Sequence, residues 1–88
     1  MSKLCISSLV VRTLPASLAR VQERIEAIPE AEVYGKSEDG RLVVVLDTVD
    51  SRQASNTLSE IQGQADILSA SLIYQYDDQF ESQLETPL

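Results

Sequence analysis

The chain has 88 residues and a mass of 9.7 kDa, enough for one modest hydrophobic core but not for a second domain. It has no His, and its one Cys can form neither an internal disulfide nor a thiolate metal cage. The 14 acidic and 7 basic residues give a net charge of −7, which repels nucleic-acid phosphates and attracts basic partners. These values exclude a disulfide-stapled secreted scaffold and argue against nucleic-acid binding.

The first 19 residues superficially resemble a short secretory signal. However, Ser7 and Ser8 interrupt the apolar run and Arg12 ends it, as expected for a strand followed by a helix. The longest clean apolar run, Leu42–Leu46, is far shorter than the roughly 20 residues that a membrane-spanning helix needs. We therefore expect a soluble cytoplasmic protein that does not bind membranes.

The first half of the chain predicts a strand and a helix. Residues 4–12 are rich in β-branched and apolar types, which favour a strand. Pro15 suits the first turn of a helix, and Pro29 cannot continue one. An apolar stripe at helical spacing begins just before Pro15 and ends just before Pro29, formed by Leu14, Leu18, Val21, Ile25 and Ile28.

Two strands, a second helix and a final strand follow. Residues 31–37 and 41–49 predict strands joined at Asp39-Gly40, a strong hairpin signal. Asp50 or Ser51 can cap the second helix, which Gly63 ends. Its apolar stripe consists of Ala54, Leu58, Ile61 and Ala65. Residues 67–76 predict the last strand.

The predicted order β-α-β-β-α-β defines the ferredoxin-like α+β fold. In this fold a four-stranded antiparallel sheet has the order 4-1-3-2 and carries both helices on one face. The other face of the sheet is open. We assign residues 1–77 to this domain and expect residues 78–88 to form a flexible acidic tail, because they are mostly polar and acidic.

Asp47 indicates which residues face the open side. A lone carboxylate under the helices would need a partner, so Asp47 is expected to point away from them, and Val43 and Val45 share its face by strand alternation. On the last strand, Leu68, Ala70, Leu72 and Tyr74 are assigned to the core, and Gln75 faces outward. The candidate binding residues on the open face are Ile6, Ser8, Val10, Glu32, Tyr34, Val43, Val45, Asp47, Ser69, Ser71 and Ile73.

This face is more apolar than a solvated sheet surface and has an acidic rim, which indicates a contact surface. The face binds another chain, a second copy of this one, the chain's own tail or a small molecule, or it has no occupant. No catalytic constellation, metal site or cofactor site is evident in the sequence. RNA-binding domains of this fold stack bases on aromatic residues of the sheet, and here the sheet offers Tyr34 at best. Cys5 is best explained as a small apolar strand residue.

Three segments carry a family resemblance over residues 4–76, mainly through their order and spacing. They are Ser8-Leu9-Val10-Val11, Gly40-Arg41-Leu42-Val43-Val44-Val45-Leu46-Asp47 and Ile67-Leu68-Ser69-Ala70-Ser71-Leu72-Ile73-Tyr74. Together they resemble the NapD family. The chain departs from the family pattern at Glu30, where Gly is common, and at Gln75, where His is common.

The resemblance implies a cytoplasmic chaperone, not an enzyme, for the catalytic subunit of periplasmic nitrate reductase. Such a chaperone binds the twin-arginine signal peptide of the precursor and delays export until the molybdenum cofactor of the reductase is inserted. It carries no cofactor itself. The peptide's apolar stretch would lie on the open face, and its arginines would meet Asp47 or Glu32. The alternatives are a regulatory small-ligand domain and a dimerisation module, and the chain is expected to be a monomer or a weak homodimer.

Overall fold

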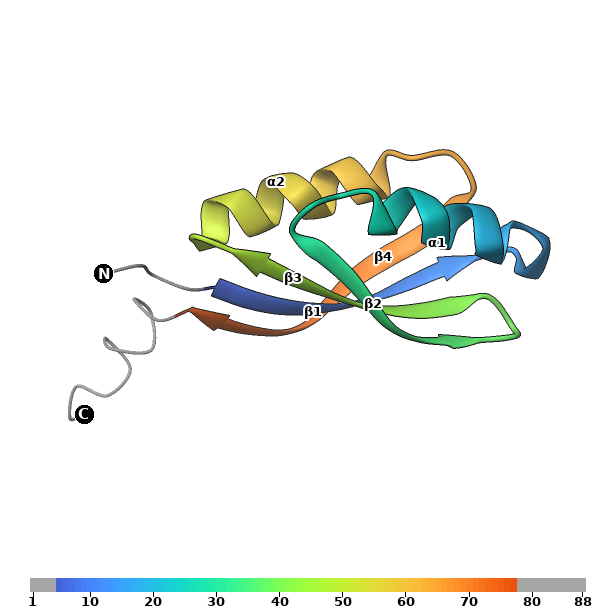
Figure 1. Ribbon diagram of the computed structural model, residues 1–88, viewed down its shortest axis with the longest axis horizontal. Helices are drawn as coiled ribbons and strands as arrows, with labels where there is room; N and C mark the ends of the chain where they lie inside the picture. The colour runs from blue at the N-terminus through green and yellow to red at the C-terminus, as the bar shows by residue number, and fades with distance from the viewer. Residues whose placement is uncertain (1–4, 78–88) are drawn as a thin grey trace.

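The computed structural model describes residues 5–77. Four strands and two helices are arranged as two layers, with both helices on one face of the sheet (Figure 1). In chain order the elements are β1 (Cys5–Thr13), the 3₁₀ turn η1 (Pro15–Ser17), α1 (Leu18–Glu26), β2 (Ala31–Ser37), β3 (Arg41–Thr48), α2 (Ser51–Gln62) and β4 (Ile67–Asp77). The predicted tail at residues 78–88 lies outside the described residues.

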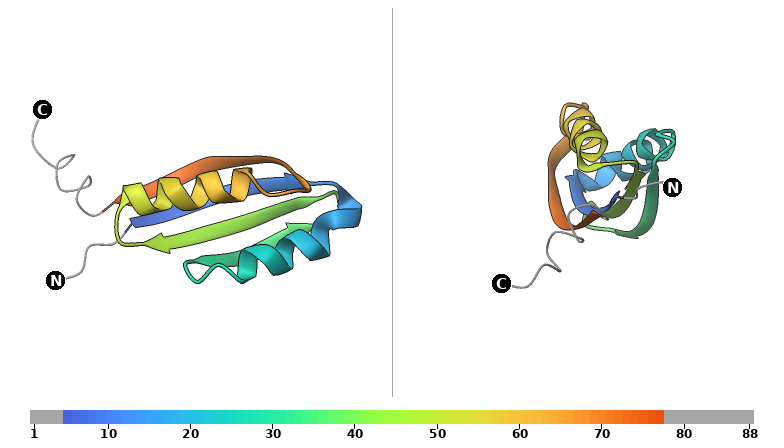
Figure 2. Two further views of the ribbon diagram at one scale, coloured as in Figure 1. Left: turned by 90° about the horizontal axis from the view of Figure 1, so that it is seen from above. Right: turned by 90° about the vertical axis from the view of Figure 1, so that its left-hand side faces the viewer.

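The sheet has the order β2-β3-β1-β4, and all neighbouring strands are antiparallel. The predicted ferredoxin-like α+β fold is thereby confirmed. The end view in Figure 2 shows the sheet curving around the two helices. The other side of the sheet, which we call the open face, carries no helix within residues 5–77.

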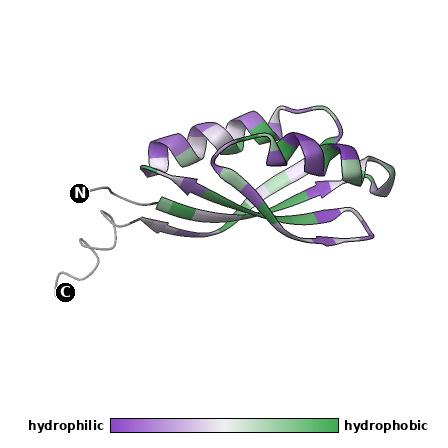
Figure 3. Cartoon of the chain, in the orientation of Figure 1, coloured by the Kyte–Doolittle hydropathy of each residue, from purple (hydrophilic) through white to green (hydrophobic). Residues whose placement is uncertain are grey.

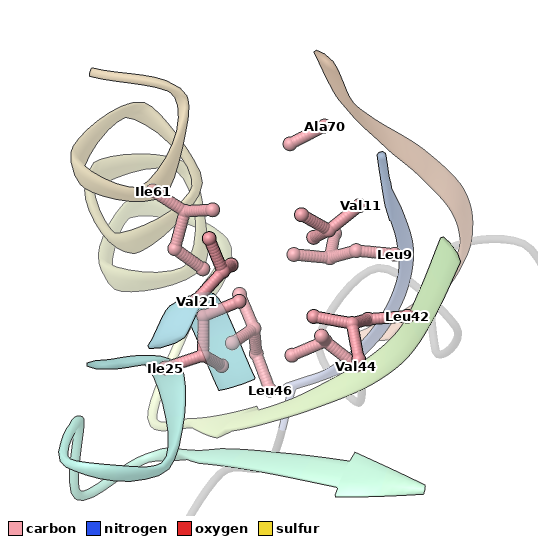
Figure 4. Close-up of a cluster of buried hydrophobic side chains, with 9 residues drawn as sticks. All are labelled: Leu9, Val11, Val21, Ile25, Leu42, Val44, Leu46, Ile61 and Ala70. Carbon is pink, nitrogen blue, oxygen red and sulfur yellow. The ribbon is translucent and has the colours of Figure 1, made fainter. Parts of the chain in front are cut away.

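The core lies between the sheet and the two helices. In Figure 4 side chains from β1 and β3 point toward Val21 and Ile25 of α1 and Ile61 of α2. The whole cluster is Leu9, Val11, Val21, Ile25, Leu42, Val44, Leu46, Ile61 and Ala70. Figure 3 shows hydrophobic colour along β1 and β3 and hydrophilic colour over much of the helix surface. This is the pattern expected when each helix buries one stripe.

The predicted hairpin between β2 and β3 forms, and Gly40 is essential to it. Gly40 has φ +103°, which side-chain-bearing residues rarely adopt. Its carbonyl accepts a hydrogen bond of 2.7 Å from the Thr13 amide, and a Cβ at Gly40 would collide with the Thr13 carbonyl oxygen. The turn is therefore also a contact with the end of β1.

Both predicted apolar stripes extend beyond the helices that form. Leu14 is exposed and precedes η1, so it does not belong to the helix, and α1 begins at Leu18. Asp50 caps α2 by accepting a hydrogen bond from the Gln53 amide, as predicted. Ala65 lies beyond the end of α2 and is exposed, so its assignment to the stripe was wrong.

The predicted alternation along β4 is also wrong, because two irregularities interrupt its pairing with β1. The register passes from Leu9–Leu72 to Ser8–Tyr74, which leaves Ile73 as an extra residue without a Cα partner. An extra residue reverses the faces of those that follow, so Tyr74 lies on the open face and Gln75 on the helix side.

Contacts confirm this reversal. The Gln75 side-chain amide donates a hydrogen bond of 3.0 Å to the hydroxyl of Ser7, which is buried on the helix side. Leu68 is exposed at the second irregularity, so it is not in the core as predicted. Leu72 does face the helix side, but α2 leaves it partly exposed.

Candidate functional site

The open face is built from rows of side chains that the strand register places side by side. Each row contains one residue of β1, its partner on β3 and, toward the edges, residues of β2 and β4. From the start of β1 to its end, the rows are Tyr76, Ile6 and Asp47; Tyr74, Ser8, Val45 and Glu32; Ser71, Val10, Val43 and Gly35; and Ser69, Arg12, Arg41 and Ser37. The rows give the face an apolar centre and two chemically different ends.

Most of the predicted contact residues are brought together by these rows. The predicted phases of β1 and β3 are confirmed, because Ile6, Val10, Val43 and Val45 share the open face. Ile73 and Tyr34 are the exceptions, since each occupies a bulge and has no Cα partner in the rows. Tyr34 nevertheless lines a groove together with Ile6 and Asp47. Ser69 lies beside Arg12, away from the predicted acidic rim.

The end of the face near the start of β1 is acidic, and we call it the carboxylate end. Asp47 and Glu32 lie there, and neither side chain forms an ion pair within residues 5–77. They border a groove of about 230 Å³ whose lining includes Ile6, Val45 and Tyr34. Glu30 also lines the groove, but its carboxylate accepts a hydrogen bond of 2.7 Å from Thr57 of α2.

Three tyrosines lie at the carboxylate end, and these are all the tyrosines in the chain. Tyr34 is 66% exposed and Tyr74 is 58% exposed, while Tyr76 pairs with Ile6. The sequence prediction found only Tyr34, because uninterrupted alternation assigned Tyr74 to the core. The three rings are interspersed with carboxylates, so they are suited to a cation and not to a phosphate backbone.

The opposite end, which we call the arginine end, carries Arg12 directly across from Arg41. Arg41 forms a surface ion pair of 3.2 Å with Asp39. A hydrogen bond from Ser37, together with that from Arg41 and the charge of Arg12, holds the pKa of Asp39 below its ordinary value. Two guanidinium groups thus share one neighbouring carboxylate at this end.

A shallow apolar depression lies next to the arginine end. Its volume is about 350 Å³, and its lining includes Val10, Val43 and Gly35. A bulge at Tyr34 shifts the pairing of β2 so that Gly35 lies opposite Val43 on the open face. A Cβ at Gly35 would meet no atom within 4 Å, so the missing side chain leaves open space at the surface.

Elsewhere the described residues show no other candidate for chemistry. A third cleft, of about 310 Å³, lies on the helix side between α2 and β4 and is mostly apolar. Cys5 is fully buried. Within residues 5–77 no group of three or more acidic or Cys side chains is placed to hold a metal ion. No helix in this part of the chain is long and apolar enough to cross a membrane.

The fold and the open face define a small ferredoxin-like protein with an apolar, charge-polarised contact surface. Residues 4–79 match the model of the NapD protein family, and the chain belongs to that family. A similar solved structure is the solution structure of the E. coli Tat proofreading chaperone protein NapD. The two chains are 29% identical, the match covers 97% of this chain and 88% of the other, and the TM-score is 0.77. A comparison with curated proteins gives no match.

Proposed function

We propose that this protein is a cytoplasmic proofreading chaperone that binds a twin-arginine signal peptide on its open face. The partner we propose is the precursor of the catalytic subunit of periplasmic nitrate reductase. Binding would delay export until the molybdenum cofactor of that subunit has been inserted. Membership of the NapD family and the structural similarity to a Tat proofreading chaperone support this proposal.

The observation that carries the proposal is that one exposed surface combines an apolar centre with carboxylates that form no ion pair within residues 5–77. A twin-arginine signal has a cationic start followed by an apolar stretch. Ile6, Val10, Val43 and Val45 form a continuous apolar strip along β1 and β3, and Asp47 and Glu32 border one end of it. The cationic start and the apolar stretch of the peptide are therefore complementary to the acidic end and the apolar centre of the face.

The backbone of the face limits how a peptide can lie on it. β1 and β3 are internal strands whose backbone groups pair with their neighbours. A peptide lying across the centre gains no backbone hydrogen bonds from them and must satisfy its own. A helix-forming apolar stretch meets this requirement, and Ser8 keeps the middle of the face low enough for close approach.

Electrostatics would add to the apolar contact. Each hydrogen bond between an arginine and a partly desolvated carboxylate contributes about 1.5–3 kcal/mol. Ordering a flexible peptide offsets part of this gain. Since the carboxylates are exposed, binding should weaken as salt increases.

Titration calorimetry with a synthetic nitrate reductase signal peptide, at low and high salt, tests the proposal. We expect tight binding that weakens with salt, and no comparable binding of a peptide with the same composition in scrambled order. A folded protein that does not bind would contradict the proposal. Gel filtration at two protein concentrations would then show whether the open face instead joins two copies of the chain.

A further inference from the structure

The open face is asymmetric along β1, and this asymmetry is sufficient to set the direction of a bound peptide. Ile6 and Asp47 mark one end of the face and Arg12 and Arg41 mark the other. Arg12 lies six positions after Ile6 along β1, which corresponds to a distance of about 20 Å. Carboxylates and tyrosines gather at the first end, and opposed arginines at the second.

The carboxylate end has the chemistry of a guanidinium site. Asp47 and Glu32 offer two carboxylates, one for each of two arginines, and a planar guanidinium matches a carboxylate in a bidentate manner. The exposed rings of Tyr34 and Tyr74 can also cover a guanidinium plane, an interaction that favours Arg over Lys. Aromatic and acidic groups occur together only at this end of the described face.

The arginine end disfavours the same ligand. Arg12 and Arg41 are direct cross-strand partners, and like charges in that position already repel each other. A further guanidinium group placed beside this pair would compete with Arg41 for Asp39, which Arg41 already engages. The depression beside Gly35 is apolar and open, so it suits aliphatic or aromatic side chains.

We propose that the arginine pair of the peptide binds among Asp47, Glu32, Tyr34 and Tyr74, and that the apolar stretch then runs toward the Gly35 depression. The N-terminal part of the peptide thus lies beside the start of β1, and the peptide runs in the same direction as that strand. Tyr74 is the residue that selects arginine. This inference rests on the proposed function, because it assumes that the open face is the peptide site.

Paramagnetic relaxation in the intact protein tests the direction. A nitroxide is attached to the signal peptide either just before the arginines or at the end of the apolar stretch, after calorimetry has shown that each labelled peptide binds. The first label should broaden the amide signals of Glu32 and Asp47, and the second those of Gly35 and Arg41. The reverse pattern, or equal broadening at both ends from either label, would overturn the proposed direction.

The two proposals fail in different ways. An unlabelled peptide that does not bind at all contradicts the proposed function, and the direction falls with it. A peptide that binds at the open face but in the reverse direction contradicts only the inference drawn here. A peptide that binds while all its relaxation effects lie on α1 and α2 contradicts the assignment of the open face.

The role of Tyr74 is tested by combining protein and peptide variants. Tyr74→Ala should weaken binding about threefold to tenfold, and Tyr74→Phe should retain most of the affinity because the ring remains. With a peptide whose two arginines are replaced by alanine, Tyr74→Ala should have no further effect. An equal loss with both peptides would show that Tyr74 contacts the apolar stretch instead. Leu68→Ala, at an exposed position far along the same strand, is the matched control and should bind normally.

Discussion

The two faces of β3 differ in what covers them although both carry valines at their centre. Val44 is fully buried against the helices, whereas Val43, its neighbour in the chain, is 42% exposed on the open face. Both are valines, so composition alone does not separate a packing residue from a contact residue. The positions of the two helices determine which valine stabilises the fold and which is available to a partner.

The central and edge strands differ in a second way. β1 and β3 pair without interruption, so their alternation is regular from Cys5–Thr48 to Arg12–Arg41. The edge strands β2 and β4 contain bulges at Tyr34 and Ile73. The regular pair forms the apolar strip, and the bulges move Gly35 and Tyr74 onto the open face. The edge strands therefore supply Tyr74 at the carboxylate end and Gly35 beside the arginine end, and these residues make the two ends different.

Glutamate substitution at adjacent positions of β3 should show the largest contrast. Val44→Glu buries a carboxylate with no partner and should cost several kcal/mol, comparable to the whole stability of a small domain. Val45→Glu places the same carboxylate on the open face, so the fold should persist while peptide binding falls at least about tenfold. Circular dichroism measures the first effect and calorimetry the second. An unfolded Val45→Glu protein would show that the two faces were assigned the wrong way round.

Two glycines of the β2–β3 hairpin should differ nearly as much. Gly40→Ala forces a side chain into a positive-φ conformation and against the Thr13 carbonyl, so we expect a loss of about 2 kcal/mol or more in the free energy of unfolding. Gly35→Ala adds a methyl group into open space and should change stability by less than about 0.5 kcal/mol. Urea denaturation compares the two variants. Equal losses would mean that the strain at Gly40 is relieved elsewhere.

Most of the fold follows from local patterns in the sequence. The order of elements follows from the alternation in β1 and β3, from the helical stripes that end near Pro29 and Gly63, and from the Asp39-Gly40 turn. That order in turn predicts the strand order of the sheet. The carboxylate of Asp47 correctly indicated which side of β3 faces away from the helices, because burying it would require a partner.

The bulges could not be predicted in the same way. A bulge depends on how one strand fits its neighbour, and the sequence around Ile73 alternates equally well in either phase. Tyr74 was therefore assigned to the core on its hydrophobicity, and Gln75 was assigned outward on its polarity. The hydrogen bond from Gln75 to Ser7 reverses both assignments, since it satisfies two polar groups on the helix side. A long-range pairing of this kind leaves no signal in local spacing.

Reversing one charge at the carboxylate end should weaken binding without affecting the core. Asp47→Lys removes a hydrogen-bonding carboxylate and adds repulsion toward the arginines, so we expect about tenfold to hundredfold weaker binding and a flatter dependence on salt. Glu60→Lys makes the same charge change at an exposed position of α2, and its affinity should change far less. Calorimetry at two salt concentrations compares them. Unchanged affinity in a folded Asp47→Lys protein would remove Asp47 from the site.

The smallest expected effect concerns acid titration at the arginine end. The folded-state pKa of Asp39 is lowered, first by the Ser37 hydroxyl and then by Arg41, so the ionised carboxylate is the form that the fold favours. Its contribution to stability is present above the unfolded-state pKa and is lost as the pH falls through the folded-state value. Ser37→Ala should raise the pKa of Asp39 toward 3.8, as measured by NMR titration of the carboxyl carbon. Since Asp39 is exposed, the melting temperature at neutral pH should not change measurably. An unchanged pKa would show that Arg41 and Arg12 hold the carboxylate ionised without the Ser37 hydroxyl.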